Sequence, residues 1–406
     1  MRLFLKSYQY WLRTVISLVF FGCSQVGWSQ STTKINEQAT DSLDIQKYPV
    51  EIDFLVSYYR QNGDHSAVTG GIGTESLDDI STEVIVNIPI DSVSRVGIDG
   101  GFSHYSSAST DNIDSRVSSA SARDNRARIY LSYERDQPKN KSAFGVSAGV
   151  SIESDYLSNS IGLNYRKQSA DQNRSISLAA SVLLDKWTMI FPEELRATAH
   201  REFSTDKRRS YSFSANYSHV INRRLQASFH TDVVYQQGII STPFHRVYYI
   251  DGTVGVERLP TSRFKFPIGF RLNYFYHDKS VMRFFYRFYA DTYGIFSHTF
   301  NLEVPFKPGP SVTLYPFYRF YTQTAADHFA PFEGHAVEAE YRTSDFDLSA
   351  FHSHKIGAGI RFSPLYGIGK KKENSILKTI AFRGAAYLRS DGLWAAVVSS
   401  RFSFRF

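Results

Sequence analysis

The sequence predicts an all-β fold, a transmembrane antiparallel up-and-down β-barrel, on three observations. Apolar and polar side chains alternate along segments of about nine to fifteen residues, whereas soluble strands average about five or six and a tilted membrane strand needs about nine to eleven. Aromatic residues make up 15% of the chain and crowd the ends of these segments, as the girdles of membrane barrels do. The chain also ends on an amphipathic segment whose last residue is Phe406.

Composition excludes several other classes of protein. A mean hydropathy of −0.30 is too polar for a helical membrane protein, and the aromatic content is too high for a disordered chain. The single cysteine, Cys23, rules out an internal disulfide framework and a multi-cysteine metal centre. The net charge of +7 is spread along the chain, so no nucleic-acid partner is expected.

The first 29 residues have the pattern of a secretory signal peptide. Basic residues open the chain, an apolar run of ten residues covers 14–23, and the small residues Gly27 and Ser29 precede the expected cleavage site. The run is too short to span a bilayer as a helix. A lipid anchor on Cys23 is the alternative, although Phe20 matches a lipoprotein signal poorly.

The mature chain is expected to have two parts. Residues 30–47 are polar and without periodicity, which predicts a flexible periplasmic segment. Residues 48–406 carry the strand pattern and are expected to form the outer-membrane β-barrel. In 263–276, for example, Phe264 and every second residue after it are apolar or aromatic, while the residues between them include Arg271.

The final segment supports membrane insertion. Phe402, Phe404 and Phe406 share one face of 393–406, and Arg401 lies on the other. Such an ending resembles the signal by which Gram-negative outer-membrane barrels are recognised. The barrel assembly machinery and outer-membrane lipids are therefore expected partners. In lipid every backbone group needs an internal partner, so the strands must close into a barrel.

Counting the alternating segments gives sixteen strands. They are expected at 49–60, 80–90, 95–105, 126–135, 142–153, 156–166, 175–184, 209–220, 224–235, 263–276, 281–290, 295–305, 311–321, 355–363, 376–388 and 393–406. An even number places both termini in the periplasm. A hairpin missed within 236–262 or 322–354 would make eighteen strands, and one misread pair would make fourteen.

The connections between the expected strands are asymmetric. One side has only short periplasmic turns, and the other has long outer loops at 61–79, 106–125, 185–208, 236–262 and 322–354. This asymmetry is typical of barrels in the outer membrane of Gram-negative bacteria, which is the location expected after signal-peptide cleavage near Ser29. Loops of this length are usually functional or disordered, and these are not of low complexity.

Several unusual stretches identify a family resemblance. They are HSAVTGGIGTE (65–75), SSASTDNID (106–114), STPFHRVY (241–248), RFY (287–289), TQTAADHFAP (322–331), SDFDLSAFHSHKIGAG (344–359) and SPLYGIG (363–369). On these the chain resembles, over roughly 48–406, the uncharacterised outer-membrane family catalogued as domain of unknown function 3570, found mainly in Bacteroidetes. The resemblance implies an outer-membrane barrel without assigned activity. It also implies a link to a small periplasmic lipoprotein and to periplasmic redox or metal chemistry, and it brings no catalytic residues.

Histidines concentrate in the expected outer loops. Seven of the 12 lie there, namely His65, His200, His245, His328, His335, His352 and His354. With nearby carboxylates they define a candidate divalent metal site made of His352, His354, Asp345, Asp347, His328 and His335, because imidazole and carboxylate suit transition metals. The alternative is a hydrated loop in which these side chains are merely polar, since no fixed ligand spacing appears.

A glycine-rich outer-loop motif lies beside His65. Gly70, Gly71 and Gly73 lack the following helix and lysine of a phosphate-binding loop, so a tight turn with positive φ is the expected role. Carboxylates around it, such as Asp64 and Glu75, are a weaker candidate for Ca²⁺ binding.

The polar faces of neighbouring strands place arginines in the barrel lumen. Arg271, Arg283, Arg287 and Arg319 are the expected lumen-lining residues. A basic wall would favour anions, and the alternative is an interior neutralised by acidic residues such as Glu134 and Asp232.

These observations favour a porin-like channel for small polar or anionic solutes, gated by ordered outer loops. The first alternative is a non-conducting barrel whose loops bind a metal, a cofactor or the partner lipoprotein. The second is a rim-located hydrolase using His104 with Ser106, or Asp345 with His352, although no complete catalytic motif is present. The prediction is therefore that the protein is not an enzyme.

Overall fold

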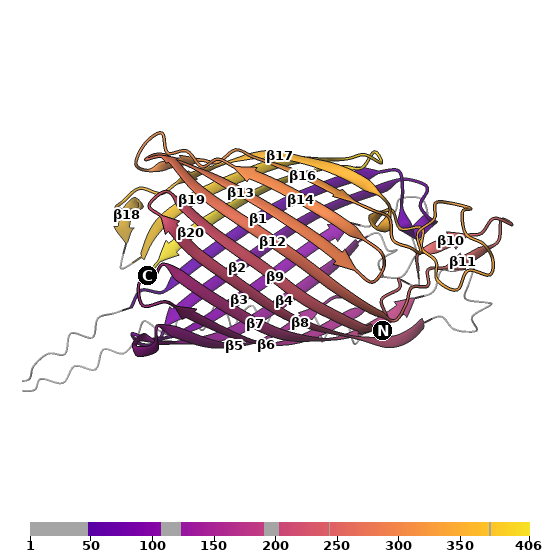
Figure 1. Cartoon of the computed structure of the whole chain (residues 1–406), viewed down its shortest axis with the longest axis horizontal. Coiled ribbons are helices and arrows are strands. Elements are labelled where there is room, and N and C mark those ends of the chain that lie inside the picture. The colour runs from indigo at the N-terminus through magenta and orange to yellow at the C-terminus, as the bar shows by residue number, and fades with distance from the viewer. Residues whose placement is uncertain (1–47, 107–122, 191–202, 243, 373–374) are drawn as a thin grey trace, which may run out of the picture. The chain divides into compact units, whose positions relative to one another are not determined.

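The computed structural model describes residues 48–106, 123–190, 203–242, 244–372 and 375–406. Their strands form one antiparallel sheet that closes on itself (Figure 1). The predicted signal peptide, the predicted segment 30–47 and His200 lie outside the described residues. Residues Tyr48–Phe406 form one compact unit, and no helix among the described residues is long and apolar enough to cross a membrane.

Sixteen strands cross the barrel wall, which confirms the predicted fold class and strand number. They are β1 (Glu51–Gly63), β2 (Glu75–Pro89), β3 (Ser94–Ser106), β4 (Arg123–Gln137), β5 (Ser142–Ile152), β6 (Tyr156–Gln168), β7 (Arg174–Ile190), β8 (Phe203–Asn222), β9 (Leu225–Gly238), β12 (Ser262–His277), β13 (Ser280–Asp291), β14 (Phe296–Glu303), β15 (Val312–Leu314) continued by β16 (Phe317–Gln323), β17 (Phe351–Phe362), β19 (Ser375–Arg389) and β20 (Trp394–Arg405). The break between β15 and β16 falls at Pro316, which has no backbone N–H to donate.

Three shorter strands lie outside this count. β10 (Arg246–Tyr248) and β11 (Val254–Val256) pair only with each other, within the connection from β9 to β12. β18 (Ile368–Lys372) pairs with β19 in the connection that follows β17. The long segments 236–262 and 322–354 therefore add no strand to the wall, and the eighteen-strand alternative was wrong.

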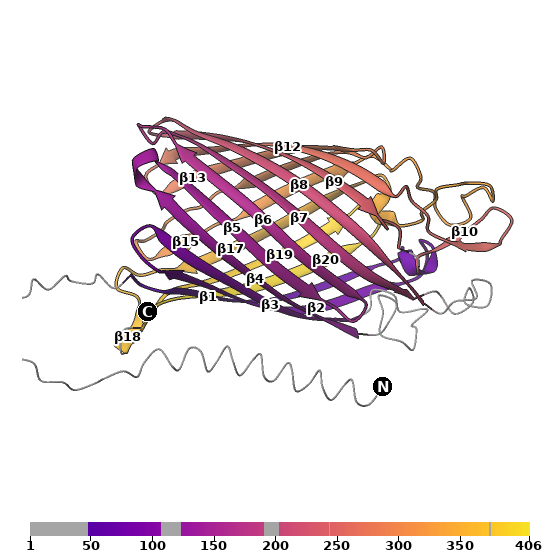
Figure 2. The same cartoon turned by 90° about the horizontal axis from the view of Figure 1, so that it is seen from below.

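The two ends of the barrel differ as predicted. One, called here the turn end, has tight connections such as Arg223–Arg224 and Asp278–Lys279. The other, called the loop end, carries the long connections, including the β10–β11 hairpin. Figure 2 shows β10 at one end and β18 at the opposite end. In outer-membrane barrels long loops face outward and short turns face the periplasm.

The strand faces follow the predicted alternation. On β17, Ile356 and Ile360 are 64% and 44% exposed, on the side that would meet lipid. Lys355 and Gly357 lie on the other side, and Lys355 lines a cavity inside the barrel. The outward apolar face and the polar interior are the pattern of a membrane-spanning barrel.

Strands extend farther toward the loop end than the alternation predicts. β7 ends at Ile190 where 184 was expected, β8 begins at Phe203 where 209 was expected, and β17 begins at Phe351 where 355 was expected. On β7 and β8 the outward apolar alternation stops at the predicted boundaries, but backbone pairing continues beyond them. The predicted boundaries therefore mark where the apolar face ends, and the hydrogen-bonded strands are longer.

The first and last strands close the barrel. β1 pairs with β20 from Glu51 opposite Arg405 to Asn62 opposite Trp394. Beside this seam the Arg401 guanidinium donates two hydrogen bonds to the Asp53 carboxylate, Nε to Oδ1 at 3.1 Å and Nη2 to Oδ2 at 2.6 Å. This two-pronged pair fixes the register of the closing strands.

Replacing Asp53 with asparagine is expected to weaken the seam. The Arg401 side chain is 52% exposed, so screening limits the loss to about 1–2 kcal/mol in the free energy of unfolding. Guanidinium titration of the detergent-solubilised barrel measures it. Asp278→Asn, in an exposed turn, is the control and should shift the free energy by less than about 0.5 kcal/mol. If Asp53→Asn and Asp278→Asn unfold at the same guanidinium concentration, the Asp53–Arg401 pair does not stabilise the seam.

Candidate functional site

Four connections at the loop end pack together into an ordered layer, called here the cap, whose described residues are 64–74, 239–242 with 244–261, 292–295 and 324–350. Arg246 Nη1 donates to the Val68 carbonyl at 2.7 Å, and Ile250 N donates to the His335 carbonyl at 3.0 Å. Leu259, Tyr293, Ile295 and Ala326 form a buried cluster inside the cap. These loops have their own core, which is why they are ordered.

The glycine motif joins two of these loops. Gly70, Gly71 and Gly73 have φ of +79°, +85° and +81°, the left-handed values expected for a tight turn. A Cβ on Gly71 would lie 2.7 Å from the Ser344 carbonyl oxygen. His65 stacks on Phe346 with ring centroids 3.8 Å apart. The motif therefore brings 64–74 against 324–350, where a side chain at Gly71 would not fit.

The cap also brings His245, Glu257 and Asp345 together. His245 directly precedes β10 and Glu257 directly follows β11, and Glu257 N donates to the His245 carbonyl at 2.9 Å. His245 Nδ1 lies 3.7 Å from Glu257 Oε2 and 3.8 Å from Asp345 Oδ2. The three ligand atoms lie within 4.8 Å of one another. One imidazole nitrogen and two carboxylates thus converge from two loops.

Titration in this cluster reflects burial and close charges. Burial, reinforced by the neighbouring Asp347 carboxylate, raises the pKa of Asp345 to about 6. For His245, burial alone would lower the pKa, but the Glu257 and Asp345 carboxylates outweigh it and raise the pKa above its usual value. Both shifts favour bound protons, because two carboxylates in this pocket face one imidazole.

The structure does not bring the six metal ligands expected from sequence into one site. His352 and His354 are exposed on the outward face of β17, where His354 Nδ1 lies 2.7 Å from the Tyr318 hydroxyl and both imidazoles contact Phe320. Because β17 begins at Phe351, these histidines belong to a strand and not to a loop. They lie among the aromatic side chains of the outward face.

The other members of that set lie in the cap but apart. His335 is buried, with Nε2 3.0 Å from the Thr343 carbonyl oxygen, and burial lowers its pKa. His328 packs against Tyr293 and Tyr341. Asp347 pairs with Arg389 at 2.5 Å. Of the six, His352 and His354 lie together on β17 with ring centroids 5.7 Å apart, and Asp345 lies beside another histidine, His245.

A second carboxylate cluster was not predicted. Asp124, Glu153 and Asp155 present oxygens within 4.8 Å of one another beside the β5–β6 turn. Burial raises the pKa of Asp155 to about 6. Neither this cluster nor Glu257 carries a sequence signal, because their members come together only through strand pairing and loop packing.

The proposed rim-hydrolase residues are not assembled either. His104 lies on β3 with Nδ1 2.8 Å from Asn125 Oδ1, and it is exposed. Asp345 lies in the cap, while His352 is on the outward face of β17. Neither pair forms a nucleophile and base within hydrogen-bond reach.

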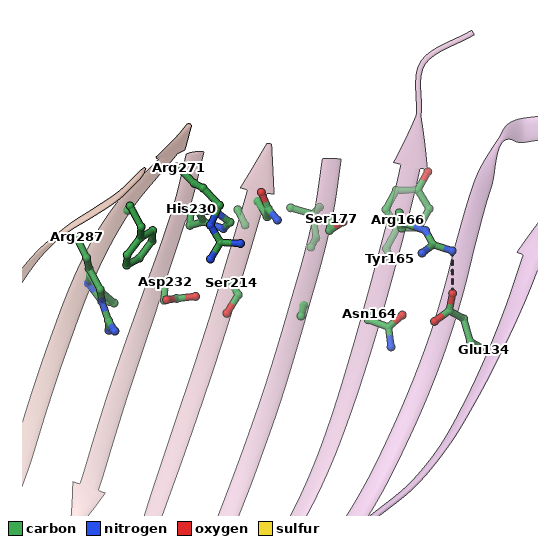
Figure 3. A pocket seen from close by; sticks show the side chains of 17 residues that line it. Glu134, Asn164, Tyr165, Arg166, Ser177, Ser214, His230, Asp232, Arg271 and Arg287 are labelled. Atoms are coloured by element: carbon green, nitrogen blue, oxygen red, sulfur yellow. Dashed lines mark hydrogen bonds and ion pairs between the residues drawn. The ribbon is translucent and has the colours of Figure 1, made fainter. Parts of the chain in front are cut away.

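The expected lumen arginines line cavities inside the barrel. Arg271 and Arg287 border a cavity of about 450 Å³ that also touches Asp232, Ser214 and Glu134. Its lining residues come from seven strands of the sheet (Figure 3). Arg283, nearer the turn end, pairs with Glu303 at 2.9 Å.

A second cavity, called here the chamber, has a volume of about 580 Å³. Its basic side chains are Arg287, Arg319, Lys355 and Arg389, and its polar and aromatic side chains include Tyr59, Gln61, Thr299, Tyr321, Ser353 and Tyr387. Asp347 of the cap is the one acidic side chain among the described residues that line it. The chamber therefore lies beside the cap and is strongly basic.

Solved structures with a similar fold include several outer-membrane proteins. The siderophore receptor PirA from Acinetobacter baumannii matches with a TM-score of 0.45 and 12% identity, over 83% of this chain and 53% of that one. A bacterial polysaccharide outer-membrane secretin matches with a TM-score of 0.45 and 10% identity, over 89% and 100%. The monoaromatic hydrocarbon channel TodX, as a mutant, matches with a TM-score of 0.37 and 11% identity, over 88% and 89%. The chain spans about half the length of the siderophore receptors that it matches.

The sequence itself matches one family. A comparison with curated proteins finds no relative. The family described as protein of unknown function (DUF3570) matches residues 17–367, which is most of the barrel and agrees with the stretches identified in the sequence. The chain therefore belongs to the DUF3570 family.

Proposed function

We propose that this protein is an outer-membrane channel for small anionic solutes, which pass through the lumen and are controlled by the cap at the loop end. The lumen presents charged and polar side chains to the passing solute, and the barrel faces lipid with apolar ones. A solute entering from the loop end would meet the cap first and the chamber next.

The observation that carries this proposal is a pair of like charges in the chamber. Arg319 on β16 and Lys355 on β17 are directly opposite each other in the strand register. Directly opposed like charges destabilise a sheet. Among the described residues, neither side chain forms an ion pair with a carboxylate. A bound or passing anion would neutralise this pair.

Two other lumen arginines are held in place by aromatic rings. Arg271 lies over the Phe285 ring at 5.4 Å, and Arg383 lies over the Phe317 ring at 4.0 Å and also pairs with Glu303 at 3.4 Å. Stacking on an aromatic face orients a guanidinium while its charge stays available to a solute. Confined positive charge of this kind concentrates anions.

The opposite wall of the lumen is small and polar. On β5 to β8 the inward positions are mostly serine, glycine and alanine, including Gly145, Ser147, Ser177, Ala179, Ser212 and Ser214. Small side chains leave room beside the long arginines across the lumen. A serine-rich wall also offers hydroxyl groups that donate to an anion.

Planar-bilayer recording tests the proposal. Purified barrel should conduct, and a potassium chloride gradient should give a reversal potential of the sign for chloride selectivity. The current should fall when chloride is replaced by a bulky organic anion at constant potassium. A barrel that inserts but shows no conductance at any voltage, or one that selects potassium, would overturn the proposal.

A further inference from the structure

We propose that His245, Glu257 and Asp345 form a binding site for a divalent transition-metal ion that holds two loops of the cap together. The site would take one nitrogen and two carboxylate oxygens as ligands. The inference rests on the cap alone and does not depend on conduction through the barrel.

Charge is the first argument. Two carboxylates, Glu257 and Asp345, converge on one imidazole, and the Glu257 side chain is only 3% exposed. Buried charges in proteins are paired or bind metal ions. A proton on His245 would supply one positive charge against two negative ones, whereas a divalent ion with neutral histidine balances the site.

The distances are the second argument. A protonated imidazole donating to a carboxylate would lie about 2.7–2.9 Å from its oxygen, but His245 Nδ1 lies 3.7 and 3.8 Å from the two oxygens. This nitrogen is buried and has no hydrogen-bond partner among the residues that the structure describes. Ligand atoms bound at about 2.1 Å to one ion lie about 3.0–3.6 Å apart, for angles between about 90 and 120°. A shift of a few tenths of an ångström would therefore bring both His245 distances to a value that one shared ion allows.

Preorganisation is the third argument. Thr343 is fully buried and contacts both acidic residues: its hydroxyl donates to Glu257 Oε2 at 2.6 Å and accepts from Asp345 N at 3.1 Å. The other Glu257 oxygen accepts from Thr242 N at 2.6 Å. The remaining Asp345 oxygen accepts from Asp347 N at 2.9 Å. Both carboxylates are thus oriented by neighbours that are not ligands, as at metal sites.

The donor set selects the class of metal. Imidazole with carboxylates suits zinc, manganese or iron, whereas calcium prefers six to eight oxygens. His245 and Glu257 flank the β10–β11 hairpin, and Asp345 belongs to the connection between β16 and β17. A bound ion would therefore cross-link two loops that are distant in sequence.

The test measures zinc and manganese on intact barrel purified in detergent, first stripped by a chelator. Wild-type protein should take up about one ion per chain in elemental analysis after dialysis. His245→Ala and Glu257→Gln should each weaken the affinity by 10-fold or more. His352→Ala/His354→Ala, on the outward face, is the matched control and should bind as wild type does.

Two further measurements keep the test decisive if a variant damages the cap. Cobalt(II) bound to wild-type barrel should give visible absorption bands of nitrogen and oxygen coordination, which need no variant. Asp345→Asn, a nearly isosteric change, should lose those bands while the barrel keeps its heat-modifiable mobility. The proposal is overturned if wild-type protein binds no stoichiometric metal, if the three variants bind like wild type, or if the control loses the ion.

Discussion

Replacing Tyr293 with alanine is expected to open the cap and raise the conductance of the barrel. The Tyr293 side chain has no exposed surface and lies at the centre of the buried cluster with Leu259, Ile295 and Ala326. Removing a buried aromatic ring typically costs about 3–5 kcal/mol. The strands of the wall are far more extensively paired than the loops, so the loss falls on local stability of the cap.

Tyr293→Phe is the matched control, because it keeps the ring and removes only the hydroxyl that donates to the Pro260 carbonyl at 2.7 Å. Its expected cost is about 1 kcal/mol. Protease cleavage within 239–261 and 324–350 reports the opening independently of current. If Tyr293→Ala leaves both cleavage and conductance unchanged, the cap neither depends on this cluster nor controls the lumen.

The barrel could be predicted from the sequence because its signals are local. Alternation along one strand reports its two faces, and a segment such as 263–276 needs no knowledge of its neighbours. The even number of strands and the contrast between short and long connections follow from counting the same alternating segments. Lumen arginines such as Arg271 and Arg287 were found for the same reason, since each sits on the polar face of a predicted strand.

The placement of His352 and His354 depends on where the strand that contains them begins. The alternation predicts that this strand begins at residue 355, which places both histidines in a loop beside Asp345. The strand begins at Phe351, and period two then turns both imidazoles to the same outward face as Ile356. His352 and His354 interrupt the apolar pattern of the outward face, so the alternation alone places the start of this strand too late.

The cap could not be derived from sequence because its contacts are long-range. Glu257 and Asp345 are distant in the chain, and only the β10–β11 hairpin and the loop around Thr343 bring them to His245. Each of these loops lacks periodicity, so no local pattern indicates which partners meet. The sequence indicates histidine-rich loops of unusual composition, but it does not indicate that His245, Glu257 and Asp345 meet.

Reversing the two opposed charges of the chamber is expected to change which ions the barrel selects. Arg319→Glu/Lys355→Glu replaces two cations with two carboxylates, while Arg287 and Arg389 remain. Four units of charge then change in a confined space. The chloride-to-potassium permeability ratio should fall by about 10-fold or more, measured as a reversal potential that shifts toward potassium.

Lys139→Glu/Arg223→Glu separates this local effect from net charge. It changes the total charge by the same amount, but both residues are exposed in connections at the turn end. At physiological ionic strength the Debye length is about 8 Å, so charges that are exposed to solvent in these turns are screened from the chamber. The control should therefore keep the selectivity of the unchanged barrel. If both double variants shift the reversal potential equally, selectivity comes from the overall field of the protein, and the Arg319–Lys355 pair is not the selective element.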